Sequence, residues 1–291
     1  PITDLVIKEN SLIVATQGRS LWALDDLTVL HQIDLKTADQ PIKLFKPKNS
    51  YRTIGGTLKT PSLTQGTNLP NGVVVNFNLK DYDTKKDTLV LYFKEKDGSL
   101  IKKFSSVDKE NKLDAKRGGN TFVWDTRYRG AKKLEGMIFW SVSFLGAKAV
   151  PGSYKVTLSK NGDTKEQSFE ILPDPRSEAT LEDMRRQFNF VNLTNATVDK
   201  AHMAIENIRI ISKKLEDFQI SYKENEEVIT LYEKSKELID SLTEIEKALY
   251  QTQNRSNQDP LNFPIKLTNK LGHLNELVTM NDFPPTDQDE V

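Results

Sequence analysis

The chain has 291 residues, a length that suggests two domains or three. Lys plus Arg and Asp plus Glu each number 41, so the net charge is zero. This balance excludes the basic surplus of a dedicated nucleic-acid binder or a polybasic membrane anchor. Cysteine is absent, which excludes disulfides and thiolate sites, and no apolar run approaches the roughly 20 residues of a membrane helix.

The first 35 residues contain three short apolar runs, at 4–7, 11–16 and 20–24, separated by turn-like residues. This spacing predicts a β meander over residues 1–35. Three strands have too little surface to form a core of their own, so we expect another layer to cover them.

Residues 36–175 continue as β structure without a helical pattern between the strands. Turn-forming Pro, Gly and Asn residues separate the apolar runs, which favours an antiparallel β-sandwich over βαβ units. Residues 54–70, rich in Gly, Thr, Pro and Gln, are predicted to form a long loop. The predicted strands lie at 42–45, 73–79, 88–93, 100–105, 120–124, 138–144, 154–159 and 167–172.

After Thr180 the apolar residues recur at the spacing of a helix. Thr180 and Asp183 together resemble a capping box at the start of this helix. An apolar stripe follows, with Asn195 and His202 at seam positions. Three amphipathic helices joined by short loops predict an up-down-up bundle. The predicted segments are helices at 180–219, at 224–251 and from Asp259-Pro260 onward, within a helical region 176–282 that precedes a polar tail at 283–291.

The sharpest local motif lies at 12–26, where an apolar strand leads into a turn and then into a second strand that ends in two acids. This order resembles the closing blade of bacterial sortilin-type, BNR-repeat β-propeller proteins. The resemblance implies a tight turn at the glycine and a tryptophan packed between blades. The motif residues are Gly18, Arg19, Trp22, Asp25 and Asp26.

Two later motifs resemble the Ig-like module of the same proteins. One is Trp124-Asp125 at the end of a predicted strand, and the other is Pro151-Gly152 followed by Tyr154. Gly152 suits the third position of a type II turn, and Tyr154 begins a strand with a buried ring. Residues 249–267 resemble the helical tail of these proteins, so the resemblance spans nearly the whole chain.

The resemblance implies that the chain is the C-terminal segment of an exported protein, in the periplasm or at the cell surface. Its first partner is then the N-terminal propeller that this chain mostly lacks. Many such proteins are labelled glycosyl hydrolases because of the propeller, but fold alone does not establish function. Two functions stay open: a non-catalytic accessory, structural or binding region, which we favour, and an accessory part of a glycoside hydrolase whose active site lies in the propeller.

No nucleophile elbow, phosphate loop or dinucleotide motif is present in the sequence, and we expect no catalytic residues and no cofactor. The expected ligand is a carbohydrate or a protein. The aromatic residues that could offer a platform to a sugar are Tyr51, Tyr82, Tyr128 and Trp140.

Two acidic groups allow a catalytic or metal-binding interpretation. Asp25 and Asp26 could form a glycosidase pair, but neighbours on a strand point to opposite faces, so we favour a structural role. Asp125 more simply caps a turn. On the first helix, Asp199, His202 and Glu206 could bind a metal, but no second pair of ligands is evident, and we favour a seam histidine.

The strands at 5–24 are expected to expose an apolar face and unpaired edges when the propeller is absent. Such edges recruit other strands. We therefore predict that the meander docks on the sandwich or pairs with a second copy of the chain, and we favour a homodimer through residues 5–24.

Overall fold

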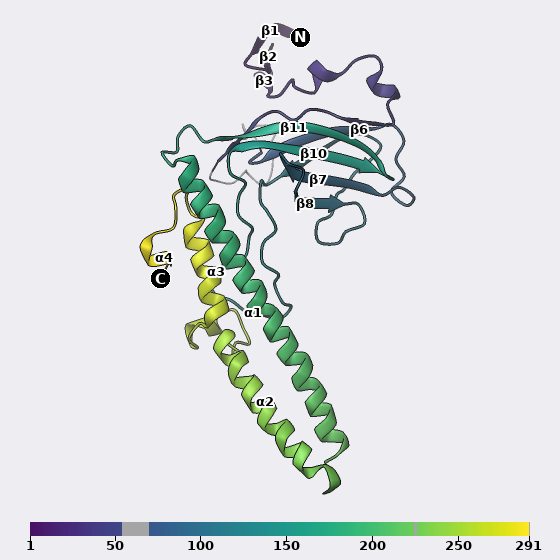
Figure 1. Cartoon of the computed structure of the whole chain (residues 1–291). Coiled ribbons are helices and arrows are strands. Elements are labelled where there is room, and N and C mark those ends of the chain that lie inside the picture. Colours follow the sequence, from purple (N-terminus) through teal and green to yellow (C-terminus); the bar gives the residue numbers. More distant parts are fainter. Residues whose placement is uncertain (54–69, 224–225, 291) are drawn as a thin grey trace. The chain divides into compact units, whose positions relative to one another are not determined.

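The structure, a computed structural model, describes residues 1–53, 70–223 and 226–290. It contains both β sheets and helices (Figure 1). The chain divides into two compact units: Pro1–Tyr128 with Lys148–Glu178, which holds the strands, and Arg129–Ala147 with Ala179–Val291, which holds the helices. The segment Arg129–Ala147, which its sequence pattern places in the β region, therefore belongs to the helical unit. Of the predicted loop 54–70, all but Pro70 lies outside the described residues.

The first unit begins with the predicted meander, in which β1, β2 and β3 pair antiparallel in that order. Glu9 and Asn10, both at positive φ, form the two-residue turn between β1 and β2. Two short 3₁₀ helices then lead to the larger sheets. The bounds are β1 Ile2–Lys8, β2 Ser11–Thr16, β3 Leu21–Leu24, η1 Leu30–Gln32 and η2 Thr37–Asp39.

The other described strands of this unit form a five-stranded sheet and a three-stranded sheet. The larger sheet contains, in spatial order, β5 (Ser50–Arg52), β11 (Asp163–Pro173), β10 (Gly152–Lys160), β7 (Leu89–Glu95) and β8 (Leu100–Ser105). The smaller contains β4 (Ile42–Leu44), β6 (Val73–Leu79) and β9 (Gly118–Trp124). All neighbouring strands are antiparallel except β5 and β11, which run parallel.

Both sheets contribute to one hydrophobic core. Alternate residues of β6 and β7 are buried, as a period of two predicts for strands with one covered face. Trp124 lies at the centre of this core, fully buried, and its ring stacks on Phe93 with 4.4 Å between the ring centroids. Each strand predicted in this region is found except 138–144, and β5 is an additional strand that the sequence pattern did not predict.

The helical unit is built on one long helix, α1 (Leu181–Ser221). Its predicted capping box is confirmed, because the Thr180 hydroxyl accepts from Asp183 N while Asp183 accepts from Thr180 N. The remaining elements are η3 (Glu226–Val228), α2 (Ile229–Leu249), η4 (Asp259–Leu261), α3 (Leu267–Val278) and α4 (Asp287–Glu290). The third long helix thus begins several residues later than predicted, and the predicted tail contains α4.

The predicted up-down-up order is wrong. At the far end of α1, Gln219 bonds to Ser235 and Arg209 pairs with Glu246, so α2 runs antiparallel to α1. Near the start of α1, Gln187 Nε2 donates to the carbonyl of Val278 at the end of α3, so α3 also runs antiparallel to it. At about 1.5 Å per residue, the 41-residue α1 is long enough to carry α2 and α3 one after the other (Figure 1).

The predicted strand at 138–144 is also wrong, because this segment joins no sheet and bends at Trp140 and Ser141, where Ser141 has a φ of 45°. Its backbone bonds to side chains of the helical unit instead. Asn269 on α3 accepts from Trp140 N at 2.8 Å and donates to Trp140 O at 2.9 Å. Gly272 of α3 lets the segment approach the helix closely, because a Cβ atom at this position would lie 2.7 Å from the Phe144 ring. A largely apolar, irregular segment therefore packs on a helix.

Candidate functional site

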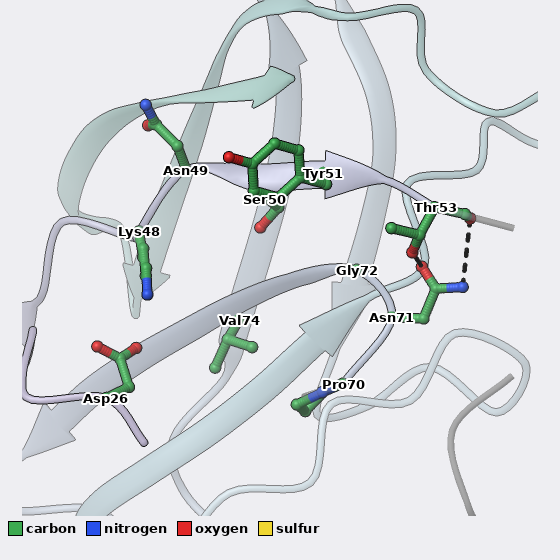
Figure 2. Close-up of a pocket in the computed structure, with 10 residues that line it drawn as sticks. All are labelled: Asp26, Lys48, Asn49, Ser50, Tyr51, Thr53, Pro70, Asn71, Gly72 and Val74. Carbon is green, nitrogen blue, oxygen red and sulfur yellow. Dashed lines mark hydrogen bonds between the residues drawn. The ribbon is translucent and has the colours of Figure 1, made fainter. Parts of the chain in front are cut away.

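A pocket with a volume of about 250 Å³ lies in the first unit, where β5 meets the turn that precedes β6 (Figure 2). The backbone approaches closely at this turn, because a Cβ on Gly72 would lie 2.2 Å from Trp124 O. Gly72 also has a positive φ of 143°, so glycine is required there for two reasons. The described residues that line the pocket are Asp26, Lys48, Asn49, Ser50, Tyr51, Thr53, Pro70, Asn71, Gly72 and Val74.

Tyr51 presents an aromatic ring to this pocket. It is 50% exposed, whereas the next residue of β5, Arg52, is buried, which is the alternation expected along a strand. The wall beside it is held by two hydrogen bonds between Thr53 and Asn71 (Figure 2). The Thr53 hydroxyl lies 2.8 Å from Asn71 Oδ1, and Asn71 Nδ2 donates to Thr53 O at 3.4 Å. The pocket therefore combines an exposed ring with a fixed polar edge.

Asp26 and Lys48 are the charged groups among the described lining residues. Asp26 is committed to the local fold: its Oδ1 accepts from Asn10 Nδ2 at 3.0 Å and from Thr28 N at 2.9 Å. These bonds hold the end of the meander to its linker, which is the structural role favoured from sequence. A ring, amides, hydroxyls and one ammonium are chemically suited to a polar, largely neutral ligand.

The four aromatic residues singled out from sequence do not form one platform. Tyr51 lines the pocket, but Tyr82 packs against the hydrophobic core and Tyr128 donates its hydroxyl hydrogen to Glu95. Trp140 belongs to the other unit. Of these four residues, only Tyr51 is among the described residues that line the pocket. The polar run around Tyr51 and the Pro70-Asn71-Gly72 turn could have indicated the pocket, but their proximity depends on the unpredicted strand β5.

The motif residues of the meander form a turn and an exposed strand. Gly18 has a φ of 79°, as a tight turn requires. Trp22 is 48% exposed, and its indole N–H donates to Arg19 O at 3.0 Å. Asp25 accepts from the Ser11 hydroxyl through its backbone carbonyl. These contacts are structural.

The Ig-like motif residues are mostly core and turn residues. Asp125 caps a turn by accepting from Arg127 N at 3.1 Å, and Tyr154 is buried, as expected. Pro151-Gly152 does not form the predicted type II turn, since Gly152 has no positive φ and is instead the first residue of β10, paired with Ile171. The strand begins two residues earlier than predicted, and its pairing with β11 determines the conformation of Gly152.

Asp199, His202 and Glu206 hold the irregular segment around Lys132 in place on α1. Asp199 Oδ1 accepts from Lys132 N at 2.6 Å, His202 Nδ1–H donates to Lys132 O at 2.6 Å, and Glu206 pairs with Lys132 Nζ at 3.5 Å. Burial lowers the pKa of His202, which keeps the ring neutral. Among the described residues, no group of three or more His, Cys, Asp or Glu side chains is arranged to hold a metal ion.

One face of the meander, hereafter the meander face, is largely apolar. In the register of the three strands, Leu5 pairs with Val14 and Val14 with Trp22, while Ile7 pairs with Leu12 and Leu12 with Leu24. Paired residues point to the same side, so all of these side chains share one face. Its β1 and β3 side chains are about half exposed or more. The meander face consists of Leu5, Ile7, Leu12, Val14, Trp22 and Leu24.

No known family model matches the chain, and no curated protein matches it. Among the described helices, none combines the length and apolar character needed to cross a membrane.

Proposed function

We propose that this chain is a non-catalytic accessory and binding region of an exported β-propeller protein. The observation that carries the proposal is the meander face, six apolar side chains on a sheet of only three strands. Such a face is stable in water when a second layer covers it. In the proposed parent, the preceding propeller supplies that layer, and the 12–26 motif forms the end of its closing blade.

The two sheets of the first unit are proposed to be an Ig-like sandwich that displays the pocket. The ladder order, the buried Trp124 and the buried Tyr154 support this assignment. The ligand we propose for the pocket is a neutral carbohydrate, because sugars stack on exposed aromatic rings and bond to amides and hydroxyls. Tyr51 is the platform, and Asn49 and Asn71 are the polar partners.

The test is calorimetric or NMR titration of the whole chain with a panel of neutral oligosaccharides. Tyr51→Ala should weaken binding about tenfold, the loss expected when one stacking ring worth roughly 1.4 kcal/mol is removed. Trp140→Ala is the matched control, since this residue is also a half-exposed aromatic but lies in the other unit. Equal losses in the two variants, or no binding to any member of the panel, would contradict the proposed site.

A second assay separates this function from an accessory role in glycoside hydrolysis. The chain and a longer protein that includes the propeller are assayed on polysaccharides and aryl glycosides. Turnover by this chain alone would contradict a non-catalytic assignment. Turnover that requires the propeller would favour the alternative, in which this chain contributes loops or binding to an enzyme.

A further inference from the structure

The part of α1 beyond Ile208 and the whole of α2 form an antiparallel pair of helices, hereafter the hairpin (Figure 1). Gln219 bonds to Ser235 and Arg209 pairs with Glu246, which determines the residues that lie at the same level. Apart from Ser235, the buried residues of these two helices all lie in α1 at or before Ile208. Among the described residues, therefore, no third layer buries the side chains of the hairpin.

The residues of the hairpin that face the opposite helix recur at spacings of three and four, as in the seam between two packed helices. The seam covers 205–219 on α1 and 232–249 on α2, and the residues at its positions, counted from the first of each range, are buried or half-buried. A twofold axis perpendicular to the plane of two antiparallel helices relates one helix to the other, so equivalent positions lie on the same side of the seam. Arg209 and Tyr250 are equivalent in this way, and the guanidinium lies 5.9 Å from the centre of the ring.

The side of the seam opposite Arg209 is apolar. The residues that lie there come directly before equivalent seam positions of the two helices and repeat every seven residues. The aliphatic side chains among them are between 44% and 58% exposed. At about 1.5 Å per residue, the row on α2 extends over roughly 21 Å, or about four helical turns. This surface, hereafter the hairpin face, consists of Ile211, Phe218, Leu231, Leu238 and Ile245.

The outer edges of the hairpin face are basic. A residue three positions further along a helix lies beside the first, one turn on. The positions three residues after the members of the face are Lys214, Ser221, Lys234, Ser241 and Ala248. These positions hold two cations and no carboxylate, and the described ion pairs of the hairpin involve neither lysine.

We propose that the hairpin face binds an amphipathic helix of a partner protein, in which acidic residues flank the apolar stripe. A third helix that packs on two antiparallel helices buries both apolar rows at once, and apolar residues at spacings of three and four cover the length of the face. The acidic residues then lie beside Lys214 and Lys234 at the edges. The inference does not depend on the Tyr51 pocket, because the hairpin belongs to the helical unit.

Charge disfavours two other occupants of the hairpin face. A second copy of the hairpin brings lysine edges against lysine edges, because both helices carry a lysine at the edge. An anionic lipid surface attracts helices that are rich in Lys and Arg, whereas α2 carries five acids and three lysines. An acidic helix is the occupant that meets only opposite charge at both edges.

The experiment titrates the whole chain with two synthetic peptides of about 18 residues, long enough to cover the face. Both peptides have Leu at spacings of three and four, but one has Glu and the other has Lys at the flanking positions. Fluorescence anisotropy should give at least tenfold tighter binding of the Glu peptide, and NMR shifts should be largest at the hairpin face. Equal affinities, or no binding of the Glu peptide, would overturn the proposal.

Two double variants on opposite sides of the hairpin locate the binding surface. Ile211→Gln with Leu238→Gln should weaken binding of the Glu peptide at least tenfold, because both apolar rows are interrupted. Ile220→Gln with Ile229→Gln is the matched control, since both side chains are exposed but lie outside the hairpin face. Equal losses of affinity in the two double variants would overturn the proposed surface.

A charge reversal keeps the test decisive if the glutamine variants do not fold. Lys214→Glu with Lys234→Glu changes only exposed side chains and should reverse the preference, so that the Lys peptide binds more tightly than the Glu peptide. An unchanged preference for the Glu peptide would contradict the role of the basic edges.

Vesicle binding and light scattering of the whole chain test the other two occupants. The chain should not bind vesicles of phosphatidylglycerol and phosphatidylcholine, and its oligomeric state should be the same with and without Ile211→Gln and Leu238→Gln. Vesicle binding that this double variant abolishes would overturn the proposal in favour of a membrane surface. A dimer that the same variant abolishes would overturn it in favour of a second copy.

Discussion

The meander and the two larger sheets are built from the same kinds of residues, but their burial differs completely. In β6, alternate side chains are fully or almost fully buried, whereas β1 and β3 contain only exposed residues. Trp124 is 0% exposed and Trp22 is 48% exposed. An alternating apolar sequence is therefore enough to form a strand. Burial requires a second layer. The larger sheets provide this layer for each other, whereas the described residues of the unit do not provide one for the meander.

The largest expected difference in stability between the two regions is the one between the alanine variants of Trp124 and Trp22. Trp124→Ala should lower the free energy of unfolding by about 3–5 kcal/mol, because it removes a ring packed between Phe93 and Phe169 and leaves a cavity. Trp22→Ala should cost less than about 1 kcal/mol, since its ring is half exposed. Denaturant unfolding of the two variants measures the difference directly. Similar losses in both would mean that the meander is covered as well as the core.

A smaller loss of stability is expected where the irregular segment around Trp140 relies on helix side chains in place of a second strand. Asn269→Ala removes both hydrogen bonds to the Trp140 backbone and should cost about 1–3 kcal/mol. Trp140 fluorescence and denaturant unfolding report the change. Asn257→Ala, at an exposed asparagine of the same unit, is the control and should stay within about 0.5 kcal/mol.

A still smaller effect on stability is expected from pH, at Asp174, directly after the end of β11. Arg176 donates two side-chain hydrogen bonds to Asp174 and lowers the pKa of Asp174 to about 2. Because this pKa lies below the unfolded value of 3.8, the stabilisation is complete above pH 3.8 and is lost as the pH falls towards 2. The contribution should be on the order of 1 kcal/mol.

Arg176→Ala provides the check on this pH effect. The variant should raise the pKa of Asp174 towards its ordinary value and flatten the acid limb of the stability curve. Carboxyl NMR titration follows the group itself. An unchanged titration of Asp174 in the variant would contradict the assigned cause.

Removing the meander should have the smallest effect on stability, but it should abolish the association of two chains. We expect the intact chain to form a dimer through residues 5–24, because the meander face and the strand edges are exposed. Deleting 1–35 should abolish the dimer and leave the two-sheet core and the helices folded. Light scattering and circular dichroism test this pair of outcomes. A chain that is monomeric at high concentration, or a dimer that survives the deletion, would contradict it.

Local signals account for the elements that were predicted correctly. The capping box at Thr180 and Asp183, the Gly18 turn and the alternation of 73–79 each depend on residues within a few positions of one another. Asn195 and His202 are buried on α1, as their seam positions predicted. The favoured structural role of Asp26 follows from equally local bonds.

The errors concern elements whose partners lie far away in the chain. Residues 138–144 have the composition of a strand, but their neighbours are α3 and Tyr250, which lie more than 100 residues later. Strand β5 is only three residues long and forms because the end of β11 pairs with it. The Tyr51 pocket could not be predicted for the same reason, since its position follows from β5.

The amino-acid sequence by itself determined the β-to-helix division near Pro173-Asp174-Pro175, most strands and the start of α1, because propensity, periodicity and capping are local. Tertiary structure alone decided that α3 follows α2 along α1, that the segment 129–147 joins the helices, and that β5 pairs with the end of β11. The physical reason is that an apolar or charged side chain does not specify its partner. The partner depends on which surfaces remain uncovered when the rest of the chain has packed.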